Sequence, residues 1–239
     1  MIQPAKHLEN TDQPDPTQES MDIAKCAFAL GGSTLLPLTA INPAGVYNAQ
    51  ISAGSLLVPE SRRIARLMLT NPTPEQWNQA LRGENLLQKK PATALRQAHL
   101  IRNRLKTLDA VGWELIADAE SEICFQLLLA AASRHSLLLS DFLRDVYASD
   151  LRRLERTLSH RQWDAFIVEC GHRDPKVNSW TVTTRKKLFE VIVRMLAEAR
   201  YLDSTRRMTL TPPLLHPEVR KYLRAIGDQT TLIRMEPQA

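Results

Sequence analysis

Apolar residues recur every three or four positions along most of the chain, which is the spacing of one face of an α-helix. The clearest pattern lies in residues 91–108, where Pro91 marks the first turn, the part of a helix that tolerates proline. Its apolar stripe consists of Ala94, Ala98, Ile101, Leu105 and Leu108. The other side carries cations and amides, and no Asp or Glu occurs from residue 96 to residue 106. Such a helix packs one side on a core and offers the other to a polyanion.

Two shorter helices are predicted before this one. The first runs from Pro59 to Met68, and the second runs from a capping box at Thr73 and Gln76 to Leu81. Two short helices followed by a longer basic one form a helix-turn-helix arrangement, in which the third helix occupies the place of the recognition helix. Packing of three helices without a nucleic acid is the competing interpretation.

The middle of the chain, from Val111 to Gly171, has the apolar stripes of a helical bundle. Within this segment, Ser159 and Gln162 form a second capping box and start another helix. We expect the segment to supply the core of the protein.

The last part of the chain has a pattern typical of a winged helix. A helix is predicted from a cap at Thr183 or Thr184 to about Arg200, and residues 206–211 then alternate between polar and apolar like a short strand. A final helix is predicted over residues 218–226, and the residues after it are expected to fray.

These patterns predict a mainly α fold class, with a helical bundle core, an N-terminal helix-turn-helix and C-terminal winged-helix-like elements. The expected parts are a partly disordered extension (1–46), a helix-turn-helix unit (47–108), the bundle core (109–174), a winged-helix-like unit (175–226) and a tail (227–239).

The charge distribution points to a function. The formal net charge is +5, but residues 60–107 hold ten Lys and Arg against three Asp and Glu, and residues 184–224 hold ten against four. Residues 109–183, between them, hold eight against twelve. Two basic segments that flank an acidic middle are typical of nucleic-acid binding, although two solvated helical faces would have the same composition.

The candidate contacts are taken from these two basic segments. The predicted phosphate contacts are Arg62, Arg63, Lys89, Lys90, Arg96, Arg102, Arg104 and Lys106 in the first, and Arg185, Lys186, Lys187, Arg194, Arg206 and Arg207 in the second. The amides of Gln97 and Asn103 are candidates for contacts with base edges.

Other chemistry is disfavoured, so we expect neither an enzyme nor a bound cofactor or metal. The sequence Gly31-Gly32-Ser33-Thr34 lacks the lysine and the spacing of a phosphate loop. The pair Cys170 and His172 offers one thiolate without a zinc spacing or an orienting third group. The acidic residues of the segment 118–122 alternate, which places them on different sides of a helix rather than around one Mg²⁺ ion.

The sequence favours a reducing, cytoplasmic location without a membrane. Its three cysteines, Cys26, Cys124 and Cys170, include no C-x-x-C pair and are expected to be reduced. The longest apolar stretch, residues 23–46, is interrupted by glycine and proline and lacks a basic start, so neither a membrane span nor a signal peptide is predicted.

Four separated segments carry a family resemblance. They are SAGSLLVPESRRIARLML (52–69), ENLLQKKPATALRQAHLIRNRLKTL (84–108), DPKVNSW followed by TRKKL (174–188) and LHPEVRKYL (215–223). Over residues 47–225 the chain resembles the BrxA family, a small non-catalytic component of BREX bacteriophage-exclusion systems. It departs from the family pattern at Lys90, where a capping serine is expected before the proline.

The resemblance implies a NusB-like helical core with winged-helix elements, double-stranded DNA and other BREX proteins as partners, and no active site. Two alternatives remain open at this point. The chain could bind RNA, by analogy with the NusB-like core, or it could be an assembly protein whose basic faces bind acidic surfaces of other defence components.

Overall fold

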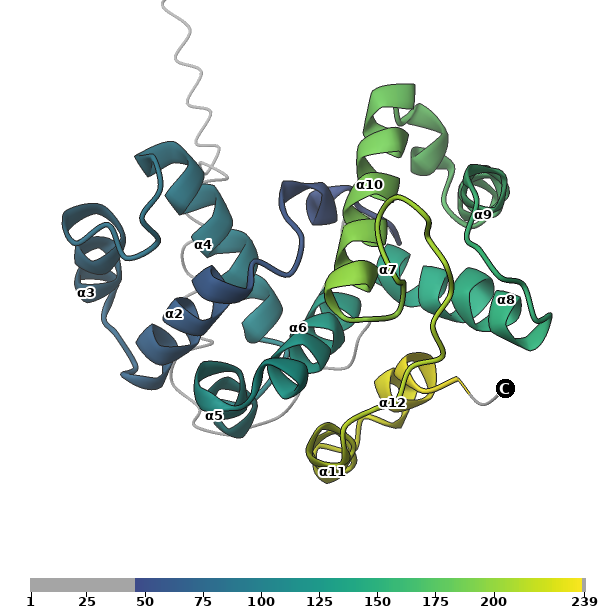
Figure 1. Cartoon of the computed structure of the whole chain (residues 1–239). Coiled ribbons are helices and arrows are strands. Elements are labelled where there is room, and N and C mark those ends of the chain that lie inside the picture. Colours follow the sequence, from purple (N-terminus) through teal and green to yellow (C-terminus); the bar gives the residue numbers. More distant parts are fainter. Residues whose placement is uncertain (1–45, 238–239) are drawn as a thin grey trace, which may run out of the picture. The chain divides into compact units, whose positions relative to one another are not determined.

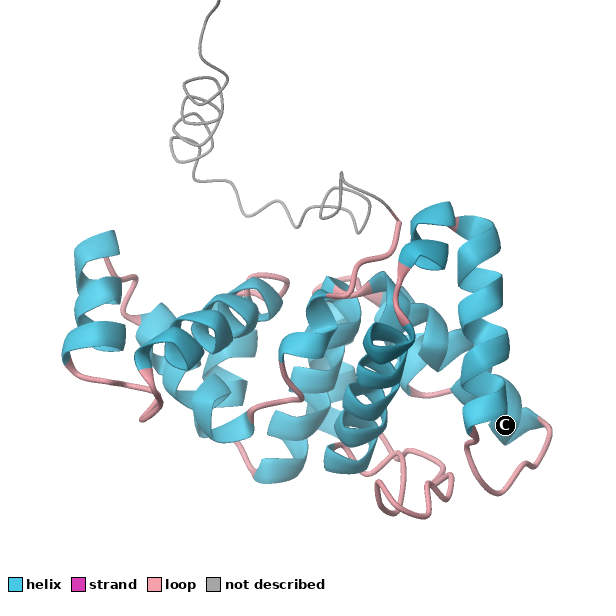
Figure 2. Cartoon of the chain, turned by 90° about the horizontal axis from the view of Figure 1, so that it is seen from above, coloured by secondary structure: helices cyan, strands magenta, loops and turns pink. Residues whose placement is uncertain are grey.

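Helices joined by loops make up residues 46–237, the part of the chain that the computed structural model describes (Figure 1). No β-strand forms within these residues (Figure 2). Two isolated bridges, Thr157–Thr209 and Leu202–Leu210, pair extended backbone there. The mainly α fold class is therefore confirmed. The described residues all belong to one compact unit, residues 37–239, and the division of the sequence into five parts stays a prediction.

The first helices follow the sequence closely. They are the 3-10 turn η2 (Gln50–Ala53), α2 (Val58–Leu69), α3 (Pro74–Asn78), the π-helical turn η3 (Gln79–Gly83) and α4 (Pro91–Leu105). The capping box of α3 is confirmed, because the Thr73 side chain accepts a hydrogen bond from the backbone N–H of Gln76 and the Gln76 side chain accepts one from that of Thr73. The apolar stripe of α4 is confirmed as well: Ala94, Ala98, Ile101, Leu105 and, just after it, Leu108 are all buried.

The central helix of these residues is α6 (Ser121–His135), which is buried on most of its sides. It contacts α2, α4, α5 (Ala110–Asp118), α7 (Leu137–Phe142), α10 (Val182–Glu198), α11 (Pro217–Ala225) and α12 (Gln229–Met235). A helix that is apolar nearly all round is stable only when other helices enclose it in this way. This helix lies within the segment predicted to supply the core, whereas α2, α4, α10, α11 and α12 lie outside it.

Two further groups complete the order of elements. After α7 the chain continues through the π-helical turn η4 (Leu143–Tyr147) to α8 (Ala148–Arg152), and α9 (His160–Arg173) is followed by the 3-10 turn η5 (Pro175–Ser179). The predicted capping box at Ser159 and Gln162 begins α9 and is confirmed.

The predicted start of α10, with Thr183 or Thr184 as the cap, was two or three residues late. The cap is Thr181, whose Oγ1 accepts a hydrogen bond of 3.1 Å from the backbone N–H of Thr184. Thr181, Thr183 and Thr184 all have a hydroxyl suited to capping. The choice among them depends on where η5 ends, which the local sequence does not reveal.

Two predictions about the C-terminal part were wrong. Residues 206–211 form a loop instead of a strand, because Thr209 and Leu210 make one isolated bridge each. The residues after α11 do not fray, because they form α12, whose Leu232 and Met235 are buried. The Tyr201 hydroxyl also donates a hydrogen bond of 2.7 Å to the carbonyl of Met235, so α12 is held by contacts from a distant part of the chain.

The cysteine prediction is confirmed for the described thiols, since Cys124 and Cys170 are free and buried. Cys26 and the segment 31–34 lie outside the described residues. Across residues 46–237 no single helix is long and apolar enough to cross a membrane. The helix α6 and the segment α7–α8 together have that length and composition, but the chain bends by 111° between them.

His135, in the last turn of α6, makes the fold sensitive to acid. Its side chain is buried, and this burial, together with the charges of Arg104 and His99, lowers its pKa to about 4. The unfolded chain has a histidine pKa of about 6.5, so between these two values it binds a proton that the folded protein does not. The stability contributed by neutral His135 is therefore complete above about pH 6.5 and is lost as the pH falls toward 4.

We expect His135→Gln to remove about 3 kcal/mol of the stability difference between neutral pH and about pH 4. Urea unfolding of both proteins at the two pH values measures this difference. His172→Gln, a change of an exposed histidine whose charge does not act on His135, is the matched control. An equal acid-induced loss in wild type and His135→Gln would contradict the assignment.

Candidate nucleic-acid interface

The outward side of α4 carries cations that face no carboxylate. Arg96 and Lys106 are exposed on this side, and Lys90 is exposed at the N-cap. None of the three forms an ion pair or a hydrogen bond through its side chain with another residue of 46–237. Their charges are therefore available to an external anion.

A histidine and an amide lie among these cations. His99 and Asn103 are one helical turn apart, and the Nε2 atom of His99 is 3.0 Å from the Nδ2 atom of Asn103. Of the two predicted base-contacting amides, Asn103 is thus on the outward side. His99, on the same outward side of α4, lies beside it.

A cation–π contact lies at the edge of this surface. The guanidinium carbon of Arg102 lies 4.4 Å from the centre of the Trp77 ring, which belongs to α3. Partial burial, and then the neighbouring Arg102 charge, lower the pKa of Lys106. A phosphate placed between these two cations would offset their mutual repulsion.

Arg104 and Gln97 do not belong to the surface that the sequence predicts. Arg104 is 4% exposed, and its two terminal nitrogens donate hydrogen bonds of 2.5 and 2.9 Å to the backbone carbonyls of Ser55 and Gly54. The Oε1 atom of Gln97 is buried without a partner among the described residues. Both side chains lie on the side of α4 that faces η2, so neither can reach a duplex on the outward side.

The predicted contacts that precede α4 are also engaged within the protein. Arg62 donates hydrogen bonds to the carbonyls of Ala117 and Ala119, at the C-terminal end of α5. Arg63 donates to the Leu86 carbonyl and to the Gln88 side chain, and Lys89 forms an ion pair of 3.2 Å with Glu60. Arg62 and Arg63 therefore hold helices and loops in place, and the charge of Lys89 is partly neutralised.

The second basic segment contributes the exposed cations of α10 and of the loop after it. Lys186, Arg194 and Arg206 are exposed and have no ion pair within residues 46–237. Lys187 lies 3.8 Å from Glu190, and Arg207 lies 3.1 Å from Asp203. Arg185 donates a hydrogen bond to the Asn178 carbonyl, which ties the start of α10 to η5.

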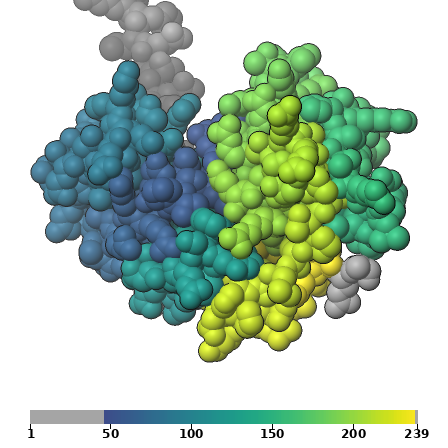
Figure 3. Space-filling view, in the orientation of Figure 1, coloured from purple at the N-terminus to yellow at the C-terminus, as the bar shows by residue number. Residues whose placement is uncertain are grey.

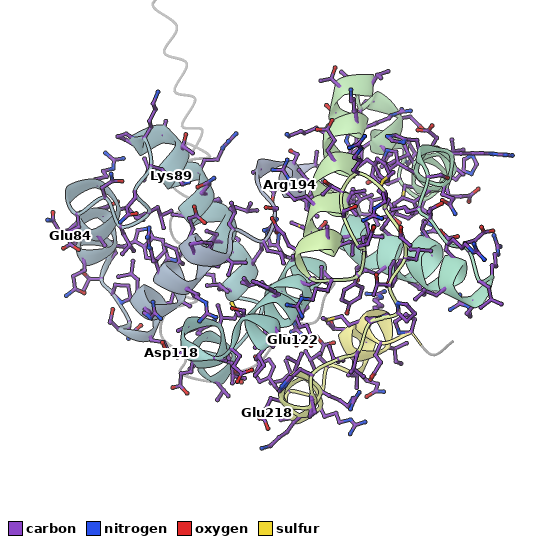
Figure 4. The ribbon with its side chains drawn as sticks, viewed as in Figure 1. Glu84, Lys89, Asp118, Glu122, Arg194 and Glu218 are labelled. Carbon is purple, nitrogen blue, oxygen red and sulfur yellow. The ribbon has the colours of Figure 1, made fainter. Side chains whose placement is uncertain are left out.

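The η2 segment connects the two basic helices. Both α4 and α10 contact η2, and just after it the backbone N–H of Leu56 donates a hydrogen bond of 2.9 Å to Glu198 of α10. Arg194 lies one helical turn before Glu198, so it projects from the side of α10 that faces this segment. Figure 4 shows Arg194 on that side of α10 and Lys89 at the start of α4. In the space-filling view the surface is hollowed between the two helices, and residues near position 50 lie between them (Figure 3).

No metal site competes with this interpretation in the described part of the chain, where no group of three potential ligands comes together. Asp118 instead pairs with Arg66 at 3.0 Å. Residues 118–121 form a junction between two helices, since α5 ends at Asp118 and α6 begins at Ser121.

Comparison with known proteins identifies the family. Residues 45–227 match the sequence model of BrxA. The chain belongs to the BrxA family. It is 38% identical over 184 residues to the BREX protein BrxA of Paramagnetospirillum magneticum (strain ATCC 700264 / AMB-1), covering 77% of this chain and 92% of that protein. It is 37% identical over 185 residues to the BREX protein BrxA of Escherichia coli O9:H4 (strain HS), covering 77% and 86%.

A solved structure agrees with the fold. The crystal structure of an uncharacterized protein from Magnetospirillum magneticum superposes with a TM-score of 0.73 at 37% identity, covering 80% of this chain and 97% of that chain. The segment that matches BrxA contains α4, η2 and α10. The candidate interface thus lies wholly within the family region.

Proposed function

We propose that this protein is a component of a BREX antiphage defence system that binds double-stranded DNA in the cytoplasm and catalyses no reaction itself. Membership of the BrxA family supports the role in defence, because the relatives from P. magneticum and E. coli are both BREX proteins. Binding to other BREX proteins is part of the same proposal.

One observation carries the proposal of DNA binding. Cations without an acidic partner among residues 46–237 lie on α4, α10 and the adjoining loops, among them Lys90, Arg96, Lys106, Lys186, Arg194 and Arg206. Both helices contact η2. Because a duplex carries one negative charge per ~1.7 Å of its axis, a surface of this kind matches its backbone without any base contact.

The aromatic residues support a duplex over single strands. Unpaired bases need exposed aromatic rings for stacking. Near the second basic helix, Phe189 is buried against Trp163, Tyr201 is buried, and Trp180 is half-buried against the core. Near the first, Trp77 is covered by Arg102. Duplex RNA remains the competing ligand, and a competition experiment with duplex DNA, duplex RNA and single strands separates these possibilities.

A salt series with random-sequence duplexes tests the proposal directly. If about six phosphates are neutralised, the logarithm of the association constant should fall with the logarithm of the salt concentration with a slope near −5. Gel shifts or fluorescence anisotropy with the purified full chain measure this slope. An affinity that does not depend on salt would rule out the phosphate contacts.

A cleft on the first helices favours a second role, the binding of another defence protein. It has a volume of about 580 Å³ and lies between α2 and the loop 84–88. Arg63 and Arg66 line it together with the apolar side chains of Leu67 and Leu86. This combination suits an acidic segment with apolar residues.

Affinity capture of other BREX proteins tests this second role. We expect capture to persist after nuclease treatment and to be reduced by Arg66→Glu, because the reversed charge would repel an acidic segment. Capture that disappears with nuclease would show instead that DNA bridges the proteins.

A further inference from the structure

The hydrogen-bonded pair His99–Asn103 has an arrangement that cations alone would not require. Its two members are four residues apart, and the amide nitrogen of Asn103 lies 3.0 Å from the Nε2 atom of His99. The pair lies on the outward side of α4, between Arg96 one turn before and Lys106 one turn after. A cationic surface that only neutralised phosphates would have no use for a neutral polar pair at this position.

The hydrogen bond within the pair determines which groups remain for a ligand. An amide nitrogen only donates, so the Nε2 atom of His99 accepts and the ring hydrogen lies on Nδ1. The groups left over are the Nδ1–H of His99 and, on Asn103, the second amide N–H and the Oδ1 acceptor.

The result does not depend on the orientation of the amide. If the Asn103 amide were turned, its oxygen would accept from Nε2–H, and the groups left over would be the Nδ1 acceptor of His99 and, on Asn103, both N–H groups and the second lone pair of the oxygen. Either way the Asn103 amide keeps an N–H donor and an oxygen acceptor side by side. Among the four bases, adenine is the one whose major-groove edge has the complementary combination, the N7 acceptor and the N6 amino donor. Guanine presents two acceptors there, so the amide oxygen would have no partner.

We propose that the His99–Asn103 pair recognises adenine in the major groove of a duplex bound along α4. This inference rests on the proposed DNA binding and adds base selectivity to it. The flanking cations Arg96 and Lys106 would hold the helix in the groove through phosphates, which carry no sequence information. The other predicted base reader, Gln97, is excluded because its oxygen is buried. Asn103 and His99 would therefore supply the selectivity of this helix.

A simpler role for the pair is local, because hydrogen-bonded side chains four residues apart slightly stabilise an exposed helix. The two roles predict different effects of a change in the DNA on its binding. A helix-stabilising pair is indifferent to the base, whereas an adenine contact is lost when the N7 atom is replaced by carbon. Replacing adenine by 7-deazaadenine makes that change and leaves base pairing and the minor groove unaltered.

The experiment uses the full chain in two stages. Selection from a randomised duplex library first identifies whether one base pair is enriched. Anisotropy then compares a selected duplex with the same duplex carrying 7-deazaadenine, or G·C in place of A·T, at the enriched position. We expect wild type to bind about tenfold more weakly after the change to G·C, which is within the range for a bidentate base contact. With 7-deazaadenine, which removes one of the two hydrogen bonds, we expect about threefold weaker binding.

The variants His99→Ala and Asn103→Ala separate recognition from folding. Each should bind all the duplexes with nearly equal affinity, close to that of wild type for the duplex without the adenine contact. Gln97→Ala, on the same helix, should keep the wild-type preference, and thermal unfolding should show that all the variants remain folded. A preference that survives in both His99→Ala and Asn103→Ala would overturn the proposal.

Two other outcomes are distinguishable from each other. Strong, salt-dependent binding to every duplex without any enriched position would overturn adenine recognition and leave DNA binding intact. No binding to any duplex at low salt would overturn both.

Discussion

Replacing Arg104 with alanine is expected to lower the free energy of unfolding by about 3–5 kcal/mol, the range for removing one partner of a buried charged contact. Its guanidinium is buried and holds the carbonyls of Gly54 and Ser55. Without it those carbonyls lose their hydrogen bonds, and a cavity opens between α4 and η2. Burial lowers the pKa of Arg104 to about 9, with Glu198 opposing the change, so the side chain is still charged at neutral pH.

Urea unfolding measured by circular dichroism tests this expectation. Arg96→Ala is the matched control, because it removes an arginine from the exposed side of the same helix and should change the stability by less than about 0.5 kcal/mol. Similar stability of the two variants would mean that Arg104 is not the link between α4 and η2. A large loss of stability in Arg104→Ala, without one in Arg96→Ala, would confirm that Arg104 stabilises the folded protein.

The double variant Arg96→Ala, Arg194→Ala should bind duplex DNA about 100-fold more weakly than wild type at low salt. Each residue is an exposed cation without an intramolecular partner among residues 46–237. A charged hydrogen bond contributes about 1.5 kcal/mol or more, which corresponds to a factor of about ten for each arginine. Because phosphate contacts carry no sequence information, the loss should be the same for all sequences, and the salt slope should decrease by about two.

The double variant Arg161→Ala, Arg224→Ala is its charge-matched control. These arginines are exposed on α9 and α11, and their removal changes the net charge by the same amount. We expect a reduction of no more than about threefold, from the general loss of long-range attraction. Equal losses in the two double variants would indicate non-specific attraction by the net charge, without a defined surface formed by α4 and α10.

The helices themselves follow from local sequence. The stripe of α4, the start at Pro91 and the capping boxes at Thr73 and Ser159 all involve residues within about one or two turns of each other. Interactions over this range depend on the helical period and on the backbone N–H groups of the first turn, which have no partner within the helix. For the same reason the strand prediction for residues 206–211 was wrong, since alternation alone does not supply the neighbouring strand that a ladder requires.

The role of each cation could not be predicted in the same way. The sequence placed Arg62, Arg96 and Arg104 in one group, yet the partners of Arg62 are the carbonyls of Ala117 and Ala119, 55 and 57 residues away along the chain. A helical period positions a side chain around its own axis and contains no information about the element that packs on that side. A capping arginine therefore has the same sequence signal as a phosphate contact.

By itself the sequence determined where α2, α4 and α9 begin, which of their faces is apolar, and that two basic segments flank an acidic middle, because these properties depend on neighbours in the chain. The tertiary structure alone decided that η2 packs between α4 and α10, that Arg104 is buried in this junction, and that Lys106 and Arg194 remain unpaired. These outcomes depend on contacts between residues about 50 to 140 positions apart. Such contacts form only when the helices pack around α6, and their geometry then decides whether a charge is used inside the protein or left for a ligand.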